Sequence, residues 1–439
     1  MDFDAIIIGA GPGGYSVAIR LGQHGKKALL IEKDRIGGEC LNYGCIPSKA
    51  LIELSCSMNY LRHMPGFRGE MGIEMPQWQE WKWGMIGKLT GGVETLCKAY
   101  GVQIEKGEAS IVDRNTVKVN GKTFTAHNLV IATGSSPAVI PNMEGVMYNR
   151  EVLDLKEIPK TMAIIGGGYI GIELGTAFAK LGSSVTIIEM MDQILPGLDK
   201  DLTRPVSRTL RELGVNVLTS TKVTSFSQQD EYVMKLDNGN EIRAQKVLLT
   251  VGRRPNTQGF GLENLQLEMD GRFIRTDSGK RTSVDGVFAL GDVSGGPMLA
   301  HKAFHEAEIV ADNIAGIPNI ADYRAMPFVI YSDPEIAYTG DISGEFKSFP
   351  LGANGRALGM NSSNGFFRIY TDQKGNVRGS VIVAPHASEM ISEITLAVES
   401  GLNAMDIGLT IHPHPTVSEG IMEVSQSVYS KPLHFKPRD

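Results

Sequence analysis

Two stretches of this chain repeat one pattern, and the repeat constrains the fold more than any other feature of the sequence. Residues 4–34, DAIIIGAGPGGYSVAIRLGQHGKKALLIEKD, read as a buried strand, a glycine-rich turn, a helix and a second strand that ends in an acid. Residues 161–190 repeat this order, and the first glycine (Gly9, Gly166) and the acid (Glu32, Glu189) both recur at an offset of 157 residues. Alternating strands and helices predict parallel sheets covered by helices, so we expect an α/β chain with two similar units.

The glycines of this pattern suit a turn that binds the pyrophosphate of a dinucleotide. The first permits a tight turn, the second lets phosphate approach the backbone, and the third allows the helix to pack on the strand. The N-terminus of the helix offers free N–H groups and the positive end of its dipole. The glycines are Gly9, Gly11 and Gly14 in the first copy and Gly166, Gly168 and Gly171 in the second. A single motif of this kind is weak support, but two in full context predict electron transfer between two bound dinucleotides.

The acid that ends each repeat is expected to hold a ribose hydroxyl. A carboxylate at Glu189 would repel a 2′-phosphate, and no arginine follows in MMDQILPG to receive one. The second site is therefore predicted to prefer NAD over NADP.

Composition excludes several classes of protein. A length of 439 residues predicts about two to four domains. The net charge of −6 is mild, so we expect no nucleic-acid partner. The N-terminus carries no leader pattern, and no run of roughly 18 apolar residues occurs, which predicts a cytoplasmic protein without membrane contact. The 4 cysteines are too few for a secreted disulfide scaffold and lack the spacing of a zinc site, so no metal is expected.

Two of these cysteines, Cys40 and Cys45, lie close together in GGECLNYGCIPSKAL, where they could form a structural staple, a metal site or a redox centre. Five residues of regular helix rise about 7.5 Å, whereas bridged cysteines need Cα atoms closer than about 7 Å, so a bridge requires a break in the helix. Gly44 suits such a break, and Pro47 suits the first turn of a following helix. Cys45 would then lie near a helix N-terminus and near Lys49, and both favour a reactive thiolate.

The motif GGECLNYGCIPSK resembles the redox-disulfide signature of the flavin-dependent pyridine nucleotide–disulfide oxidoreductases. Further motifs that resemble this family follow in order along nearly the whole chain: VIATGSSP, TVGRRPNT, ALGDVSGGPMLAHKA and HPHPTVSEG. Ser48 in PSKAL and the acid Glu189 make the chain most similar to the members that oxidise dihydrolipoamide. A related reductase acting on another disulfide or on mercuric ion is the alternative, although the tail SVYSKPLHFKPRD lacks the cysteine pair of mercuric reductases.

The resemblance implies a domain organisation. The expected fold is α/β, with two Rossmann-like dinucleotide-binding domains, one for FAD and one for NAD, and a C-terminal α+β dimerisation domain. The expected boundaries are 1–143 for the FAD domain, 144–272 for the NAD domain, 273–322 for a central segment that completes the FAD domain, and 323–439 for the dimerisation domain.

The resemblance also implies a reaction. Cys40 and Cys45 would form the redox disulfide, with Cys40 toward the substrate and Cys45 toward the flavin. His414, oriented by Glu419, would be the general base and would reach the disulfide of the other subunit in a homodimer. The substrate would be the dihydrolipoamide of a lipoylated protein from a 2-oxoacid dehydrogenase or glycine-cleavage system, oxidised to lipoamide while NAD is reduced.

Further positions are implied to contact the cofactors, and Lys49 is implied to pair with Glu173 of the NAD helix. The set comprises Gly9, Gly11, Gly14, Glu32, Gly38, Lys49, Ala109, Thr133, Gly134, Ser135, Gly166, Gly168, Gly171, Glu173, Glu189, Val223, Gly252, Asp292, Met298, Leu299, Ala300 and His301. Tyr169 resembles the aromatic residue that covers the flavin, although a packing role is an equal alternative.

Other features depart from the family or receive a structural interpretation. Glu39 stands where the family commonly has threonine, and the segment between Tyr338 and Phe349 is shortened, which leaves the physiological substrate open. Packing or loop roles are expected for Cys56, Cys97, His412, Trp78, Trp81 and Trp83.

Overall fold

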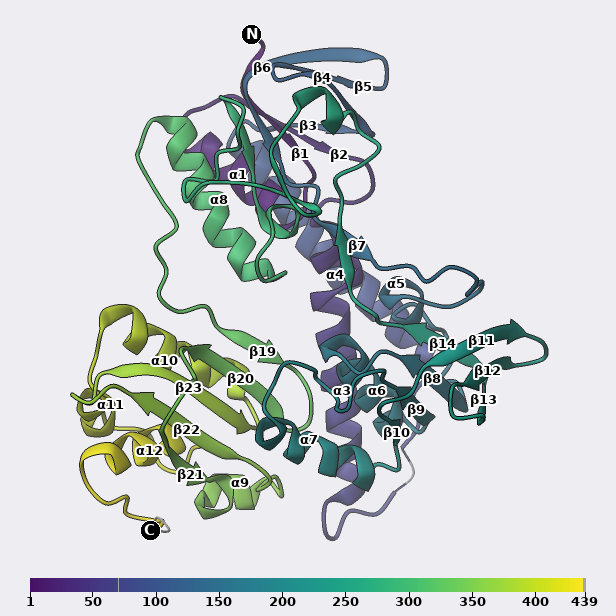
Figure 1. Ribbon diagram of the computed structural model, residues 1–439, viewed down its shortest axis with the longest axis vertical. Helices are drawn as coiled ribbons and strands as arrows, with labels where there is room; N and C mark the ends of the chain where they lie inside the picture. The colour runs from purple at the N-terminus through teal and green to yellow at the C-terminus, as the bar shows by residue number, and fades with distance from the viewer. Residues whose placement is uncertain (70, 437–439) are drawn as a thin grey trace.

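The computed structural model describes residues 1–69 and 71–436. Figure 1 shows one sheet unit at the top, a second at the lower right and the C-terminal unit at the lower left. Two long helices, α3 (Cys45–His63) and α4 (Met75–Ala99), run from the first unit toward the second (Figure 1).

The first unit is built on a sheet in which β3, β2, β1, β6 and β18 run parallel in that order. Its central strands are buried on both faces, as their continuous apolar runs require. β5 and β4 continue the sheet in antiparallel fashion beside the first half of β6. The strands are β1 (Phe3–Ile8), β2 (Ala28–Glu32), β3 (Gln103–Lys106), β4 (Ala109–Asp113), β5 (Thr116–Val119), β6 (Lys122–Ile131) and β18 (Val287–Ala289).

Helices from distant parts of the chain cover this sheet. α1 (Pro12–Gln23) and α8 (Ala300–Ala315) pack together over one face, where they share an apolar core with β1 and β6. β18 and α8 both follow the second unit in sequence, so the chain returns to the first sheet after leaving it. The short α2 (Gly38–Tyr43) and η2 (Gly291–Ser294) lie at the carboxyl edge of the sheet.

The second unit repeats the design of the first. Its sheet is parallel, in the order β10-β9-β8-β14, and a separate antiparallel sheet has the order β11-β12-β13. α6 (Tyr169–Leu181) packs against α3 of the first unit. The remaining elements are α5 (Asn149–Val152), β8 (Thr161–Ile165), β9 (Ser184–Ile188), α7 (Lys200–Glu212), β10 (Asn216–Leu218), β11 (Val223–Gln228), β12 (Tyr232–Leu236), β13 (Glu241–Ala244) and β14 (Lys246–Leu249).

A two-stranded link joins these units. β7 (Ser135–Pro137) enters the second unit beside β15 (Arg253–Pro255), which leaves it, and the two strands pair antiparallel. η1 (Leu262–Leu265), β16 (Met269–Asp270) and β17 (Phe273–Ile274) then lead back to the first sheet.

The C-terminal unit is a five-stranded antiparallel sheet in the order β19-β20-β23-β22-β21. α12 packs against β22, and a Cβ placed at Gly420 would lie 2.2 Å from the ring of Phe367, so only glycine fits there. Residues 341–345 join β20 directly to β21. The elements are β19 (Phe328–Ile330), β20 (Glu335–Gly340), β21 (Phe346–Pro350), η3 (Leu351–Ala353), α9 (Gly355–Gly359), β22 (Phe366–Thr371), β23 (Val377–Ala384), α10 (Ala387–Ser400), α11 (Ala404–Leu409) and α12 (Glu419–Tyr429).

This architecture confirms the predicted fold class, with two Rossmann-like units and a C-terminal α+β unit. The residue boundaries of the domains stay a prediction. Within residues 1–69 and 71–436, no helix combines the length and apolar character needed to cross a bilayer.

Candidate active site

A cavity of about 330 Å³ lies where the two units meet, and it brings together residues from both repeats and from the cysteine motif. Its lining includes fourteen of the predicted positions: Gly9, Gly11, Glu32, Gly38, Cys40, Cys45, Lys49, Thr133, Gly134, Ser135, Glu173, Asp292, Met298 and Ala300. Tyr169 also lines it. Positions separated by almost 300 residues in sequence therefore share one cavity.

The first glycine turn has the geometry that phosphate binding requires. Gly9 has φ +99°, and a Cβ placed at Gly14 would lie 1.8 Å from the Gly9 carbonyl oxygen, so side chains are excluded at both positions. At Gly11 no described heavy atom lies within 4 Å of such a Cβ, which leaves room at the start of α1 for a bound group. The Glu32 carboxylate accepts hydrogen bonds from Ala10 N (2.7 Å) and Asp34 N (2.7 Å).

The second glycine turn reproduces this arrangement. Gly166 has φ +112°, and a Cβ at Gly171 would lie 2.1 Å from the Gly166 carbonyl oxygen. The Glu189 carboxylate accepts from Gly167 N (2.6 Å) and Met191 N (2.7 Å), the counterparts of the Glu32 contacts. The sequence repeat is therefore also a repeat of backbone and hydrogen bonds.

The cysteines lie on two consecutive helices. Cys40 is in α2, and Cys45 is the first residue of α3, after a break at Gly44. Gly38 lies against the first glycine turn, since a Cβ there would be 2.7 Å from Gly11 Cα. The structure holds both cysteines as free thiols, and Cys45 is open to the cavity.

The two thiols differ in acidity. The hydrogen bond from the Cys40 thiol lowers the pKa of Cys45 below that of an ordinary thiol; burial opposes this effect and the Lys49 ammonium adds to it. The same hydrogen bond, together with burial, raises the pKa of Cys40. These opposite shifts favour Cys45 over Cys40 as the thiolate of the reduced pair.

Lys49 and Glu173 form the ion pair that the resemblance implied. Lys49 Nζ lies 2.8 Å from Glu173 Oε2, and Glu173 Oε1 accepts a hydrogen bond from Tyr331 N at 2.9 Å. Burial lowers the pKa of Lys49, but the Glu173 carboxylate outweighs burial and raises that pKa above its ordinary value. The ammonium therefore stays charged beside Cys45.

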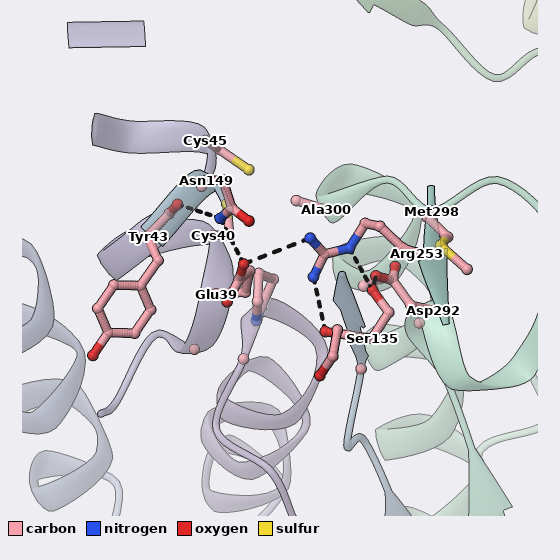
Figure 2. A pocket seen from close by; sticks show the side chains of 18 of the residues that line it. Glu39, Cys40, Tyr43, Cys45, Ser135, Asn149, Arg253, Asp292, Met298 and Ala300 are labelled. Carbon is pink, nitrogen blue, oxygen red and sulfur yellow. Dashed lines mark hydrogen bonds and ion pairs between the residues drawn. The ribbon is translucent and has the colours of Figure 1, made fainter. Parts of the chain in front are cut away.

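A hydrogen-bond network around Glu39 was not predicted from the sequence. Arg253 Nε donates to Ser135 Oγ (2.8 Å) and its Nη2 donates to Ser135 O (2.8 Å), while Ser135 Oγ donates to Asp292 Oδ2 (2.5 Å). Asn149 Nδ2 donates to Glu39 Oε1 at 2.7 Å (Figure 2). Arg253 lies in the motif TVGRRPNT, so the sequence could have indicated that it belongs to the site. Asn149 lies in none of the motifs, and nothing in the sequence pointed to it.

His414 and Glu419 form a hydrogen-bonded couple on the C-terminal unit. His414 Nδ1 lies 2.8 Å from Glu419 Oε1, which leaves the other ring nitrogen, Nε2, free to face outward, and the side chain is 78% exposed. Burial raises the pKa of Glu419, but hydrogen bonds from Thr416 N and His414 lower it below its ordinary value overall. No described hydrogen bond or cavity joins this couple to the cysteines of the same chain.

Several other predicted positions also lie outside the lining of the cavity. They are Gly14, Ala109, Gly166, Gly168, Gly171, Glu189, Val223, Gly252, Leu299 and His301. Ala109 begins β4 and Val223 begins β11. His301 Nε2 donates to Pro327 O at 2.8 Å. Their roles toward cofactors stay predictions.

The residues present fit the expected dinucleotides. The open space at Gly11, the free N–H groups at the start of α1 and the positive Lys49 and Arg253 suit the phosphates and flavin of FAD, and the Glu189 turn suits the adenosine of NAD. Among the described residues, no cluster of three histidine, cysteine or acidic side chains could hold a metal ion.

Comparisons with known proteins agree with this site. The family model described as pyridine nucleotide-disulphide oxidoreductase matches residues 3–307, and that family's dimerisation domain matches residues 326–425. Dihydrolipoyl dehydrogenases from Geobacillus stearothermophilus and Bacillus subtilis are each 43% identical to this chain, over 99% of its length and 98% of theirs.

Two solved structures are also similar to this chain over nearly its whole length. LpdA from Mycobacterium tuberculosis has a TM-score of 0.90 at 27% identity, covering 97% of this chain and 100% of that one. The HOCl-induced flavoprotein disulfide reductase RclA from Escherichia coli has a TM-score of 0.89 at 25% identity, with the same coverage. Because the family models together cover most of the chain and the curated relatives cover nearly all of it, this chain belongs to the pyridine nucleotide-disulphide oxidoreductase family.

Proposed function

We propose that this protein oxidises the dihydrolipoamide of a lipoylated protein to lipoamide and reduces NAD to NADH, using FAD and the Cys40/Cys45 pair. FAD and NAD are the cofactors of the family and of the dihydrolipoyl dehydrogenases it resembles. The observation that carries the proposal is the Cys45 thiol, acidified by Cys40 and Lys49, in a cavity that the first glycine turn also lines.

The acidity of the two sulfurs assigns their roles in thiol–disulfide exchange. A substrate thiolate attacks Cys40 Sγ of the oxidised pair, an S–S bond to substrate forms, and Cys45 leaves as a thiolate. Cys45 is the better leaving group because its pKa is lowered. The second substrate sulfur then attacks the substrate sulfur bonded to Cys40 while its proton passes to Cys40, which releases the lipoyl disulfide and returns Cys40 as a thiol. When bound, the flavin supplies the two-electron acceptor between this dithiol and the nicotinamide.

The His414–Glu419 couple supplies the proton chemistry. Glu419 accepts a hydrogen bond from Nδ1–H, so the neutral imidazole presents Nε2 as a base that takes the proton of the attacking substrate thiol. Since the couple lies away from the cysteines of its own chain, we place it at the disulfide of a second subunit in a homodimer. Residues 326–425 match a dimerisation domain, which supports this arrangement.

We assign the substrate to a 2-oxoacid dehydrogenase or glycine-cleavage system in the cytoplasm. We also retain the domain boundaries 1–143, 144–272, 273–322 and 323–439, with the second domain binding NAD. The returning strand β18 and the paired link β7–β15 support this division.

Steady-state assays of the FAD-loaded protein test the proposal. Dihydrolipoamide with NAD should give rapid turnover, whereas glutathione disulfide or mercuric ion with NADH or NADPH should give little. Loss of the dihydrolipoamide reaction in Cys40→Ser and Cys45→Ser would link it to the pair. Turnover with glutathione disulfide or mercuric ion but not with dihydrolipoamide would instead support the alternative disulfide or mercuric-type reductase.

A further inference from the structure

Glu39 precedes Cys40 directly and lies in the first turn of α2, where an acid is favoured by the helix dipole. Its Oε1 accepts the hydrogen bond from Asn149 Nδ2 at 2.7 Å and lies 3.5 Å from Arg253 Nη1. Figure 2 shows the carboxylate between these two side chains. Both partners belong to segments beyond β7, so Glu39 connects the cysteine helix to the second unit.

Asn149 holds α2 at both ends. Its buried amide nitrogen donates to Glu39 Oε1 and also to Tyr43 O at 2.6 Å. Glu39 is the second residue of α2 and Tyr43 is the last, and Cys40 lies between them. One side-chain amide therefore fixes the short helix that carries Cys40.

Arg253 balances the charge of Glu39. The guanidinium is itself held by two hydrogen bonds to Ser135. An uncompensated carboxylate on α2 would repel a phosphate at the adjacent glycine turn, because Gly38 lies against Gly11. The ion pair lets an acid occupy this place in an anion-binding cavity.

We propose that Glu39 is a positioning residue, which fixes the Cys40 helix against the second unit chiefly through Asn149 and secondarily through Arg253. The catalytic importance of this positioning rests on the proposed function, because that function uses the Cys40/Cys45 pair. The contacts of Glu39 with Asn149 and Arg253 do not depend on it. Threonine, common at this position in the family, carries its hydroxyl on Cβ. That group is two carbon atoms shorter than a glutamate carboxylate, so threonine would not keep both contacts.

The consequence reaches the sulfurs through the helix. Cys40 lies in α2 and Cys45 begins α3, so the two sulfurs keep their relative position only while these helices stay packed together. If α2 loosens, Cys40 moves away from Cys45, and its effect in lowering the pKa of Cys45 weakens. Glu39 thereby acts on Cys45 without touching it.

Two measurements on the reduced, FAD-bound protein test the proposal. The first is hydrogen exchange of the α2 backbone amides; the second is the pH dependence of Cys45 alkylation by iodoacetamide, followed by peptide mass spectrometry. Glu39→Ala and Glu39→Thr should exchange about threefold to tenfold faster in α2 and should move the alkylation midpoint up by about 0.5 to 1 pH unit. Glu39→Gln, which keeps an acceptor for Asn149, should stay within about twofold of the parent in exchange.

Matched variants separate positioning from general damage. Glu268→Ala removes a carboxylate that is paired with Arg275 at 3.4 Å on the surface, and it should change neither readout. The double variant Glu39→Ala/Asn149→Ala should exceed Asn149→Ala alone only by the smaller effect of the lost Arg253 contact. Parent-like exchange and alkylation in both Glu39→Ala and Glu39→Thr would overturn the proposal, as would a Glu39→Gln variant as altered as Glu39→Ala. Neither readout uses dihydrolipoamide, so a failure here is distinct from a failure of the proposed activity.

Discussion

Lys49 on α3 and Glu173 on α6 join the two nucleotide units through an ion pair of 2.8 Å, and both residues line the cavity that holds Cys45. The side chain of Glu173 is only 5% exposed, and its second oxygen is held by Tyr331 N. One pair therefore links α3, α6 and the loop between β19 and β20 of the C-terminal sheet. The pair also sets the charge beside the thiolate.

Replacing Lys49 and replacing Glu173 should have different effects on the pKa of Cys45. Lys49 lowers that pKa and Glu173 raises it. Lys49→Met should therefore shift the pH midpoint of Cys45 alkylation upward by about one unit, whereas Glu173→Gln should not shift it upward. The measurement is alkylation of the reduced FAD-bound protein across pH. Lys122→Met, which removes a surface lysine paired with Glu105, serves as the control, and an equal upward shift in both site variants would contradict the assignment.

The preference for NAD should depend on the charge of Glu189. Its carboxylate is buried against Gly167 N and Met191 N, so the carboxylate both shapes the turn and repels a 2′-phosphate. Glu189→Gln keeps one acceptor and removes the charge, and it should lower the ratio of kcat/KM for NAD to that for NADP by about tenfold. Steady-state kinetics with both nucleotides measures this ratio. Glu189→Ala, which loses the acceptors as well, should also raise KM for NAD, and an unchanged ratio in both variants would rule out the charge as the cause.

The sequence revealed the parts of the site that depend on local backbone conformation. Gly9 and Gly14 are glycines because a turn at positive φ and a close contact of helix with strand exclude side chains, and such requirements leave a visible pattern. The start of α3 at Cys45 was likewise visible from the residues around it.

The contacts of Glu39 were not visible, because they are made between side chains far apart in sequence. Asn149 lies 110 residues from Glu39 in the sequence. An asparagine at the start of a helix is common for local reasons, so its identity gave no sign of a distant partner. The resemblance alone placed His414 at the disulfide of the other subunit, and in the structure the His414–Glu419 couple does not line the cavity of its own chain. Such long-range pairs are set by the tertiary fold, and the Lys49–Glu173 pair could be predicted only because the motifs resemble a known family.

His412 should contribute to stability in a pH-dependent way. Its buried ring lies 3.2 Å from Glu393, and this hydrogen bond raises its pKa above the ordinary value although burial opposes the shift. A raised pKa in the folded state stabilises the protein fully below the unfolded value of about 6.5, and this contribution is lost as pH rises through the folded value. His412→Gln should therefore lower the melting temperature more at about pH 5.5 than at about pH 8.5. His63→Gln, at an exposed position on α3, is the control, and a larger deficit at the higher pH would contradict the assignment.

The catalytic base is expected to come from the second subunit of the dimer. If His414 serves the cysteines of a second subunit, a dimer of one Cys45→Ser chain and one His414→Gln chain contains one intact site, made of Cys40 and Cys45 from one chain and His414 from the other. Each variant alone should lose activity, by about 10² to 10⁴ in kcat for His414→Gln. When equal amounts of the two are dissociated and reassembled, half of the dimers are mixed, and activity should return to about one quarter of the parent level.

The matched control mixes Cys40→Ser with Cys45→Ser. These substitutions affect the same disulfide, so every site in the mixed dimer lacks one sulfur and activity should stay absent. Reassembly is followed by size-exclusion chromatography and turnover by NADH formation from dihydrolipoamide. If the Cys45→Ser and His414→Gln mixture regains no activity although mixed dimers form, His414 acts within its own chain, and the separation between the His414–Glu419 couple and the cavity must close by movement of the C-terminal unit instead.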